Sequence, residues 1–236
     1  MRKIITAILI FSSMQAASQP PGSLTGNSSP AADSLVNMYY ADQKESPLLY
    51  NGRQFYGYAS SIQGHAYYLS NTWNPGFVLF DGLLYRDKEL MYDIYRDELI
   101  IKHPKGIHVI LFRERVQQFN LAGQFFVYIE KNSEAGIRNG FYQQLTDGKA
   151  TAYVKRVKIL EEKIDGLVLE RKFLPADQFF ILKDKIYQPV KKQKDLLKIL
   201  KDKRQELSQY KSRQKIKYKE NPEQFIVRMT AYYNQL

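Results

Sequence analysis

The chain has 236 residues, no cysteine, and a formal net charge of +11 at pH 7. Without cysteine there are no disulfide bonds and no cysteine-based zinc sites, so a packed core or a metal ion must stabilise the fold. The charge is unevenly distributed: residues 19–182 carry 18 basic and 18 acidic side chains, whereas residues 183–220 carry 14 basic and 5 acidic ones. Residues 19–182 are therefore neutral, and apart from Arg2 and Lys3 the excess positive charge lies in residues 183–220.

The first 18 residues have the pattern of a secretory signal peptide. Two basic residues precede a mostly apolar run over residues 4–14, and three small residues end the segment at Ser18. The run is shorter than the roughly 20 apolar residues that span a bilayer. We therefore predict an exported protein, periplasmic, extracellular or at the cell surface, with no transmembrane segment after cleavage.

Residues 19–33 are rich in Pro, Gly and Ser and hold almost no large apolar side chain, which predicts a flexible leader. A short helix capped by Asp33 or Ser34 is expected next. Over residues 34–190 we predict an antiparallel β domain whose strands start near Leu48. Segments rich in β-branched and aromatic residues recur there every eight to twelve residues, with no helical segment between them. An antiparallel sandwich and a partly open barrel both fit this pattern.

Turn residues divide the β segments. Pairs that favour two-residue hairpins occur at Asp81-Gly82, Asp147-Gly148 and Asp165-Gly166, and more weakly at Asp184-Lys185. The chain also has 18 tyrosines, and six of them form three pairs of adjacent residues. Exposed aromatic side chains suit glycan or protein binding. The simpler expectation is that one tyrosine of each pair faces the core.

The stretch DELIIKHPKGIHVILF, from Asp97 to Phe112, contains two of the three histidines. Pro104 and Gly106 suit a type I turn followed by a left-handed residue, which predicts a hairpin that pairs Lys102 with His108. In that register His103 and His108 point to opposite faces of the sheet and cannot share a metal ion. A two-residue loop would place them side by side, but it would scatter the apolar residues over both faces.

Sites for catalysis or cofactors have little support in the sequence. His65 has no acidic residue or cysteine nearby, and no zinc, calcium, nucleotide or nucleophile motif is present. Asp93 and Asp97 could serve as the two carboxylates of a glycoside hydrolase, but residues 96–98 more simply form a charged turn between strands. The sequence predicts no metal ion and no cofactor, and it favours a non-catalytic protein over an enzyme.

Residues 191–236 form a basic helical segment that we expect to pack on the β domain. A first helix, over residues 191–214, would place Leu196, Leu200, Leu207 and Tyr210 on one side and Lys191, Lys194, Lys198 and Lys201 on another. The lysine row could contact an anionic envelope component or a protein partner, or it could be a solvated surface. Asn221 and Pro222 predict the start of a second helix, with apolar residues at Phe225, Met229, Tyr232 and Leu236.

Four phrases, taken together and in this order, resemble uncharacterised exported proteins of Bacteroidota: LLYNGRQFYGY, WNPGFVLFDGLLYRDKELMYDIYRDELIIK, FYQQLTDGKATAYVKR and KKQKDLLKILKDKRQELSQY. The resemblance runs from about Leu48 to the C-terminus. It implies a location in the cell envelope. It carries no established activity and therefore no catalytic residues.

The sequence thus favours a non-catalytic exported cell-envelope protein that acts as a binding or interaction module. Its candidate binding residues are Lys191, Lys194, Lys198 and Lys201. Export and the lack of base-reading groups argue against nucleic acid as a partner. Two alternatives remain open, a carrier of lipid or another apolar ligand and a glycan-active hydrolase that uses Asp93 and Asp97. The oligomeric state is not determined by the sequence.

Overall fold

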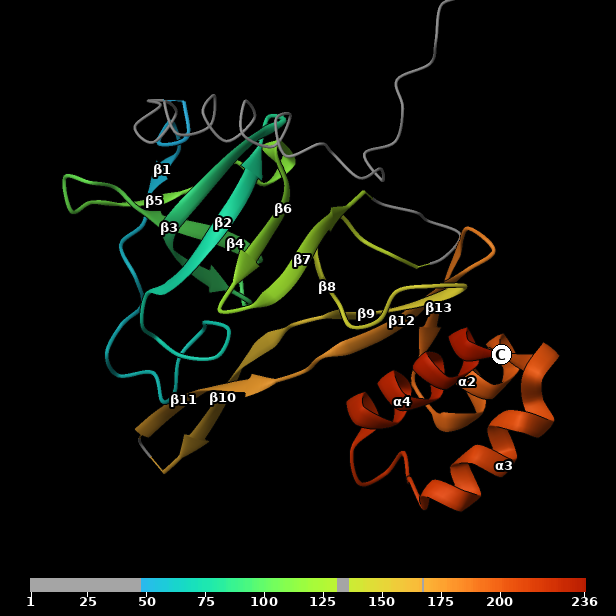
Figure 1. Cartoon of the computed structure of the whole chain (residues 1–236). Coiled ribbons are helices and arrows are strands. Elements are labelled where there is room, and N and C mark those ends of the chain that lie inside the picture. Colours follow the sequence, from blue (N-terminus) through green and yellow to red (C-terminus); the bar gives the residue numbers. More distant parts are fainter. Residues whose placement is uncertain (1–47, 131–135, 167) are drawn as a thin grey trace, which may run out of the picture. The chain divides into compact units, whose positions relative to one another are not determined.

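The computed structural model in Figure 1 describes residues 48–130, 136–166 and 168–236. The described residues all fall within one compact unit. The predicted signal peptide, the leader and the short helix after it lie outside the described residues.

The described part of the chain is mainly β, with helices at its C-terminal end, as the sequence predicts. Its strands are β1 (Arg53–Gln54), β2 (Asn74–Phe80), β3 (Leu83–Asp93), β4 (Glu98–Lys102), β5 (His108–Ile110), β6 (Val116–Leu121), β7 (Gln124–Ile129), β8 (Gly140–Gln144), β9 (Ala150–Lys155), β10 (Lys158–Asp165), β11 (Val168–Pro175), β12 (Gln178–Lys183) and β13 (Ile186–Val190). A short 3-10 turn, η1 (Arg113–Arg115), precedes β6. Eleven strands form one open sheet in the order β1-β5-β4-β3-β2-β6-β7-β8-β9-β12-β13, and β10 and β11 form a separate hairpin.

The hairpin register predicted for the histidine stretch is confirmed. Lys102 pairs with His108, and Gly106 adopts a φ of 82°. His103 packs against the ring of Tyr50 and His108 against that of Trp73, with ring centroids 4.5 and 4.7 Å apart. The two histidines therefore lie on opposite faces, as alternation along the strands requires.

Two of the predicted two-residue turns form as expected. Asp81 and Gly82 have φ angles of 51° and 76°, and Asp184 and Lys185 have φ angles of 53° and 64°. At the third site β10 and β11 do form a hairpin, but Asp165 already pairs with Val168 as the last residue of β10. That turn therefore starts one residue later than predicted.

The two-residue turn predicted at Asp147-Gly148 is wrong. Strands β8 and β9 are joined by a longer connection, residues 145–149, because the C-terminal helix supplies hydrogen bonds to it. The side chain of Asn234 accepts a hydrogen bond from the N–H of Ala150 and donates one to the carbonyl of Asp147, each 2.8 Å long. A Cβ atom at Gly148 would lie 2.7 Å from Asn234, so this contact requires glycine.

The sheet curls strongly around its first core. Tyr92 on β3 and Phe141 on β8 are separated by four steps between neighbouring strands, about 19 Å in a flat sheet at 4.8 Å per step. Their ring centroids are nevertheless only 5.8 Å apart. Phe119 and Phe126 stack on one another and both contact Tyr92, and all four rings are fully buried. Irregularities of register in β2 favour this bend. Of the two predicted arrangements, this one is closer to a partly open barrel than to a sandwich.

The C-terminal segment contains α2 (Gln193–Ile199), η2 (Lys201–Lys203), α3 (Arg204–Gln214) and α4 (Pro222–Gln235). The single helix predicted over residues 191–214 is therefore wrong: it breaks at Leu200, whose φ and ψ are −95° and 34°. The carboxylate of Asp202 in the break accepts hydrogen bonds from the ammonium of Lys183 and the hydroxyl of Tyr233, both 2.7 Å long. These contacts attach the break to β12 and α4.

The predicted apolar sides of the helices are largely correct. Leu196, Leu200 and Leu207 are fully buried, together with Ala150 and Ile181 of the sheet. Tyr210 is partly buried against the ring of Tyr232, 4.1 Å away. In α4 the buried residues are Phe225, Ile226, Met229, Thr230 and Tyr233. The inner position thus belongs to Tyr233 rather than to Tyr232, and Leu236 is only partly buried.

The start of α4 forms as predicted and is held to the sheet by an ion cluster. The Asn221 side chain accepts a hydrogen bond of 2.9 Å from the N–H of Gln224, and Pro222 follows. Arg156, which directly follows β9, donates hydrogen bonds of 2.7 Å to Asp177 and to Glu223 of α4. This contact confirms that the last helix docks on the β body. In the described part of the chain, no helix has the length and apolar character needed to cross a membrane.

Candidate functional site

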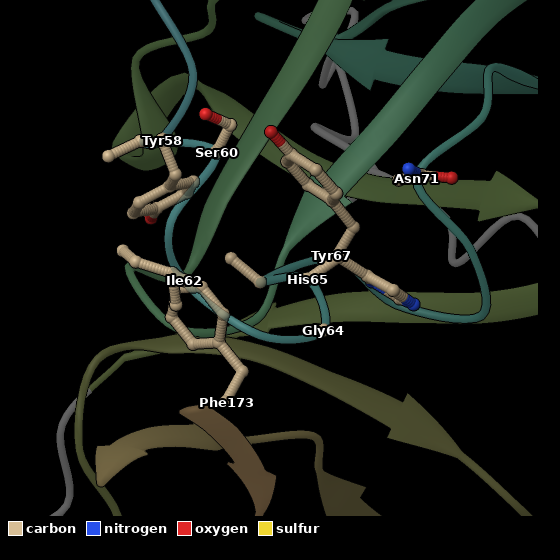
Figure 2. A pocket seen from close by; sticks show the side chains of 10 residues that line it. Tyr58, Ser60, Ile62, Gly64, His65, Tyr67, Asn71 and Phe173 are labelled. Atoms are coloured by element: carbon tan, nitrogen blue, oxygen red, sulfur yellow. The ribbon is translucent and has the colours of Figure 1, made fainter. Parts of the chain in front are cut away.

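A small pocket opens beside the β10–β11 hairpin. Its volume is about 240 Å³, and it is lined by Tyr58, Ala59, Ser60, Ile62, Gly64, His65, Ala66, Tyr67, Asn71 and Phe173. Figure 2 shows the Tyr58 and Phe173 rings on one side and Tyr67 with His65 on the other. The lining consists of aromatic rings, the aliphatic side chains of Ala59, Ile62 and Ala66, and neutral polar groups, a composition that suits binding of a small ring-shaped molecule.

The loop over residues 57–73 reaches the hairpin through backbone hydrogen bonds. The N–H of Gln63 donates to the carbonyl of Arg171 and its carbonyl accepts from the N–H of Phe173, at 2.9 and 3.1 Å. The ammonium of Lys158 donates to the carbonyls of His65 and Tyr67, at 2.6 and 3.0 Å. These bonds fix both walls of the pocket against one another before any ligand binds.

Asp93 holds the Tyr58 ring in place. Its carboxylate is fully buried and accepts hydrogen bonds from the Tyr58 hydroxyl and from the N–H groups of Tyr95 and Arg96, at 2.5, 2.9 and 3.0 Å. Burial, followed by the hydrogen bond to Asp93, raises the pKa of Tyr58 well above its usual value. The guanidinium of Arg96 lies 4.7 Å from the centre of the Tyr58 ring. Tyr58 is therefore a neutral, fixed wall of the pocket.

His65 is the one titratable imidazole in the wall. Burial, followed by the positive charge of Lys158, lowers the pKa of His65. Its Nδ1 atom is 3.3 Å from the Lys158 ammonium, and its ring is nearly parallel to that of Tyr67. At neutral pH the imidazole is uncharged and offers a hydrogen-bonding nitrogen without a net charge.

The structure places Asp93 and Asp97 in separate structural clusters. Asp97 accepts hydrogen bonds from the Tyr92 hydroxyl at 2.6 Å, from Lys155 at 2.9 Å and from Arg113 at 3.2 Å. Tyr92 belongs to the first core, whereas Tyr58 packs with the aromatic residues of a different cluster, around Phe55 and Met91. The predicted turn between the two strands lies at residues 94–97 rather than at 96–98. The N–H groups of Tyr95 and Arg96 bind the carboxylate of Asp93, so the chain turns directly after this residue.

No group of three or more potential metal ligands occurs among residues 48–130, 136–166 and 168–236. The three histidines lie in different surroundings, beside Tyr50, Trp73 and Lys158.

The four predicted binding lysines are all exposed. Lys194 and Lys198 lie one turn apart in α2, Lys191 precedes this helix, and Lys201 starts η2 after the break. The salt bridges within the described part of the chain include none of the four. The break at Leu200 means that they do not form one continuous helical row.

The pocket is the feature that the sequence does not reveal. Tyr58 and Phe173 are 115 positions apart in the numbering, and only the fold brings their rings to 5.3 Å. The adjacent tyrosines were one partial signal in the sequence. In both pairs that the structure describes, one ring is buried (Tyr68, Tyr233) and the other is partly exposed (Tyr67, Tyr232), as expected. Tyr67 thus leaves the core and enters the pocket wall. No family model, curated protein or solved structure matches the chain.

Proposed function

We propose that the chain is a non-catalytic binding module of the cell envelope, exported by its N-terminal segment, and that its pocket binds one neutral sugar ring. The observation that carries the proposal is the pairing of fixed aromatic walls with neutral polar groups around 240 Å³. Pockets for drug-sized ligands occupy about 300–1,000 Å³. The available space therefore suits a single ring at the end or in the middle of a glycan.

The charge of the lining favours a neutral ligand. Among the described residues, none of those that line the pocket is a lysine, arginine, aspartate or glutamate. The histidine of the pocket is uncharged at neutral pH because its pKa is lowered. Aromatic side chains with an apolar face and a polar edge suit the apolar faces and hydroxyl groups of a sugar. Ser60 and Asn71, both exposed at the rim, can exchange hydrogen bonds with hydroxyl groups.

The pocket proposal is tested by glycan-array screening followed by calorimetry with the best ligand. Replacing Tyr67 with alanine is expected to weaken binding by about tenfold or more, about 1.4 kcal/mol, because the ring forms one wall. Tyr56→Ala is the matched control, since Tyr56 is 84% exposed and does not line the pocket. Equal losses in both variants, or no glycan bound by the wild type, would contradict the proposal.

The exposed lysines support a second interaction, with an anionic envelope component such as a lipid surface. Each lysine near an anionic surface contributes about 1 kcal/mol at low salt. Replacing Lys191, Lys194, Lys198 and Lys201 with glutamine should therefore reduce partitioning onto anionic vesicles by about 100- to 1,000-fold, measured by vesicle sedimentation.

The matched control for the lysines removes the same number of charges elsewhere in the segment. Arg204, Arg213, Lys215 and Lys219 are also exposed, and their replacement with glutamine should reduce binding much less. If both sets reduce binding equally, the attraction is a property of the net charge alone. If neither reduces it, the lysines are a solvated surface.

The two alternatives have less support. A carrier needs an apolar cavity, whereas the space inside the curl of the sheet is filled by buried aromatic rings such as Phe119 and Phe126. A hydrolase needs two convergent carboxylates, whereas Asp93 and Asp97 are engaged with donors in different clusters.

A further inference from the structure

The β10–β11 hairpin has an outer edge with unused backbone groups. In Figure 1 the two strands continue the direction of β9 and β12 and stand apart from the main sheet. At the base of the hairpin the outer edges are occupied. The backbone N–H of Lys158 donates to the carbonyl of Ile94, and the carbonyl of Arg171 and the N–H of Phe173 bond to the backbone of Gln63. Further along β10, the edge has no such partner in the part of the chain that the structure describes.

The alternation of hydrogen bonds identifies which residues face outward. In an antiparallel pair, every second residue turns its N–H and C=O away from the partner strand. Lys158 bonds outward to Ile94, so the next outward residues on β10 are Leu160, Glu162 and Ile164. Three consecutive outward positions on one strand form a complete docking edge for a further strand.

We propose that β10 pairs antiparallel with β10 of a second copy of this chain, with Glu162 on the two-fold axis. In this register the outward residues of the two copies face one another: Leu160 opposite Ile164 twice, and Glu162 opposite Glu162. Residues with outward groups are the ones that must exchange hydrogen bonds in an antiparallel pair. The result is a four-stranded sheet in the order β11-β10-β10-β11.

The side chains of β10 are complementary to themselves in this register. Glu161 lies opposite Lys163 of the second copy, and the symmetry repeats this pair. Ile164, which is 75% exposed in the single chain, packs against Leu160 of the second copy. The two central Glu162 side chains would repel one another, but each is already paired with Arg171 of its own chain, with Nε and Oε1 2.8 Å apart. Opposite charges across strands stabilise a sheet, and like charges destabilise it.

Proline substitutions test the two edges of the hairpin separately. Glu162→Pro removes an outward N–H and leaves the β10–β11 hydrogen bonds intact. Leu169→Pro is the matched control: Leu169 faces Ile164 across the pair, so its N–H points outward from the opposite edge. By sedimentation equilibrium at about 100 µM, where a dimer with a Kd of about 10 µM dominates, the wild type and Leu169→Pro should be dimers and Glu162→Pro a monomer. A monomeric wild type, or a dimeric Glu162→Pro, would overturn the proposal.

Charge reversal tests the register and does not depend on how well the proline variant folds. Lys163→Glu places an acidic residue opposite Glu161 of the second copy on both sides of the two-fold axis. It should weaken the dimer at least tenfold. The double variant Glu161→Lys with Lys163→Glu restores both pairs and should restore the dimer. A double variant as weak as the single one would refute this register.

A disulfide gives a third measurement. The chain has no cysteine, and residues opposite one another in a hydrogen-bonded pair have Cα atoms about 5.5 Å apart, within the range for a disulfide. Glu162→Cys should therefore cross-link two copies under mild oxidation, whereas Glu161→Cys, which faces Lys163 of the second copy, should not. Equal cross-linking of both variants would show non-specific collision.

Discussion

Replacing Phe126 with alanine is expected to lower the free energy of unfolding by about 4 kcal/mol, because large-to-small changes of buried aromatic residues typically cost about 3–5 kcal/mol. Phe126 is fully buried and lies 4.7 Å from Phe119 and 5.2 Å from Tyr92, measured between ring centroids. These contacts connect strands on the two sides of the curled sheet. Since a domain of this kind is stable by about 5–15 kcal/mol in total, urea denaturation should show a large shift of the midpoint.

The neighbouring residue provides the control for this substitution. Phe125 has the same side chain on the same strand but points to the other face and is only partly buried. Its replacement with alanine should cost roughly 1 kcal/mol. Similar losses at both positions would mean that the rings inside the curl do not form its core.

Asp97→Asn is expected to lower the free energy of unfolding by about 3 kcal/mol, because breaking a largely buried ion pair leaves the partner charge uncompensated. The side chains of Asp97 and Lys155 are each only 14% exposed, and Arg113 and Tyr92 also bond to this carboxylate. Asn tolerates the left-handed φ of 59° at this position, so the substitution removes the charge without adding backbone strain. Thermal and urea denaturation both measure the loss.

Asp87→Asn is the matched control for Asp97. Asp87 has a similar left-handed φ of 53° and is exposed. Its replacement should change the stability by less than about 0.5 kcal/mol. If Asp97→Asn were equally harmless, the carboxylate would not be the group that fastens the β3–β4 turn to β8 and β9.

The parts of the fold that the sequence reveals are those with local causes. The hairpin around Gly106 was predictable because its turn residues and the alternation of its apolar residues lie within one short stretch. The N-terminus of α4 was predictable for the same reason, since Asn221 caps the N–H of Gln224 three residues later. The break at Leu200 was not, because the partners of Asp202 are Lys183 and Tyr233, both distant in sequence.

The candidate site follows the same rule. The four lysines were visible as part of a charged segment, although the prediction that they form one continuous helical row was wrong. The pocket depends on Tyr58, which is held by Asp93, and on Phe173, which comes from the hairpin. Asp93 was singled out in the sequence as a possible catalytic acid, but its buried carboxylate positions a neighbouring ring. Neither pairing leaves a pattern in the sequence, because both join segments that only the folded sheet brings together.

NMR mapping on isotope-labelled protein, titrated with neutral glycan fragments of the envelope, tests directly whether the aromatic pocket binds a sugar. Chemical-shift changes are expected only in the loop around Tyr58, His65 and Tyr67 and at Phe173, with none in α2. Shifts at Lys194 and Lys198 alone, or no shifts at saturating glycan, would contradict the proposal that the aromatic pocket is a sugar-binding site.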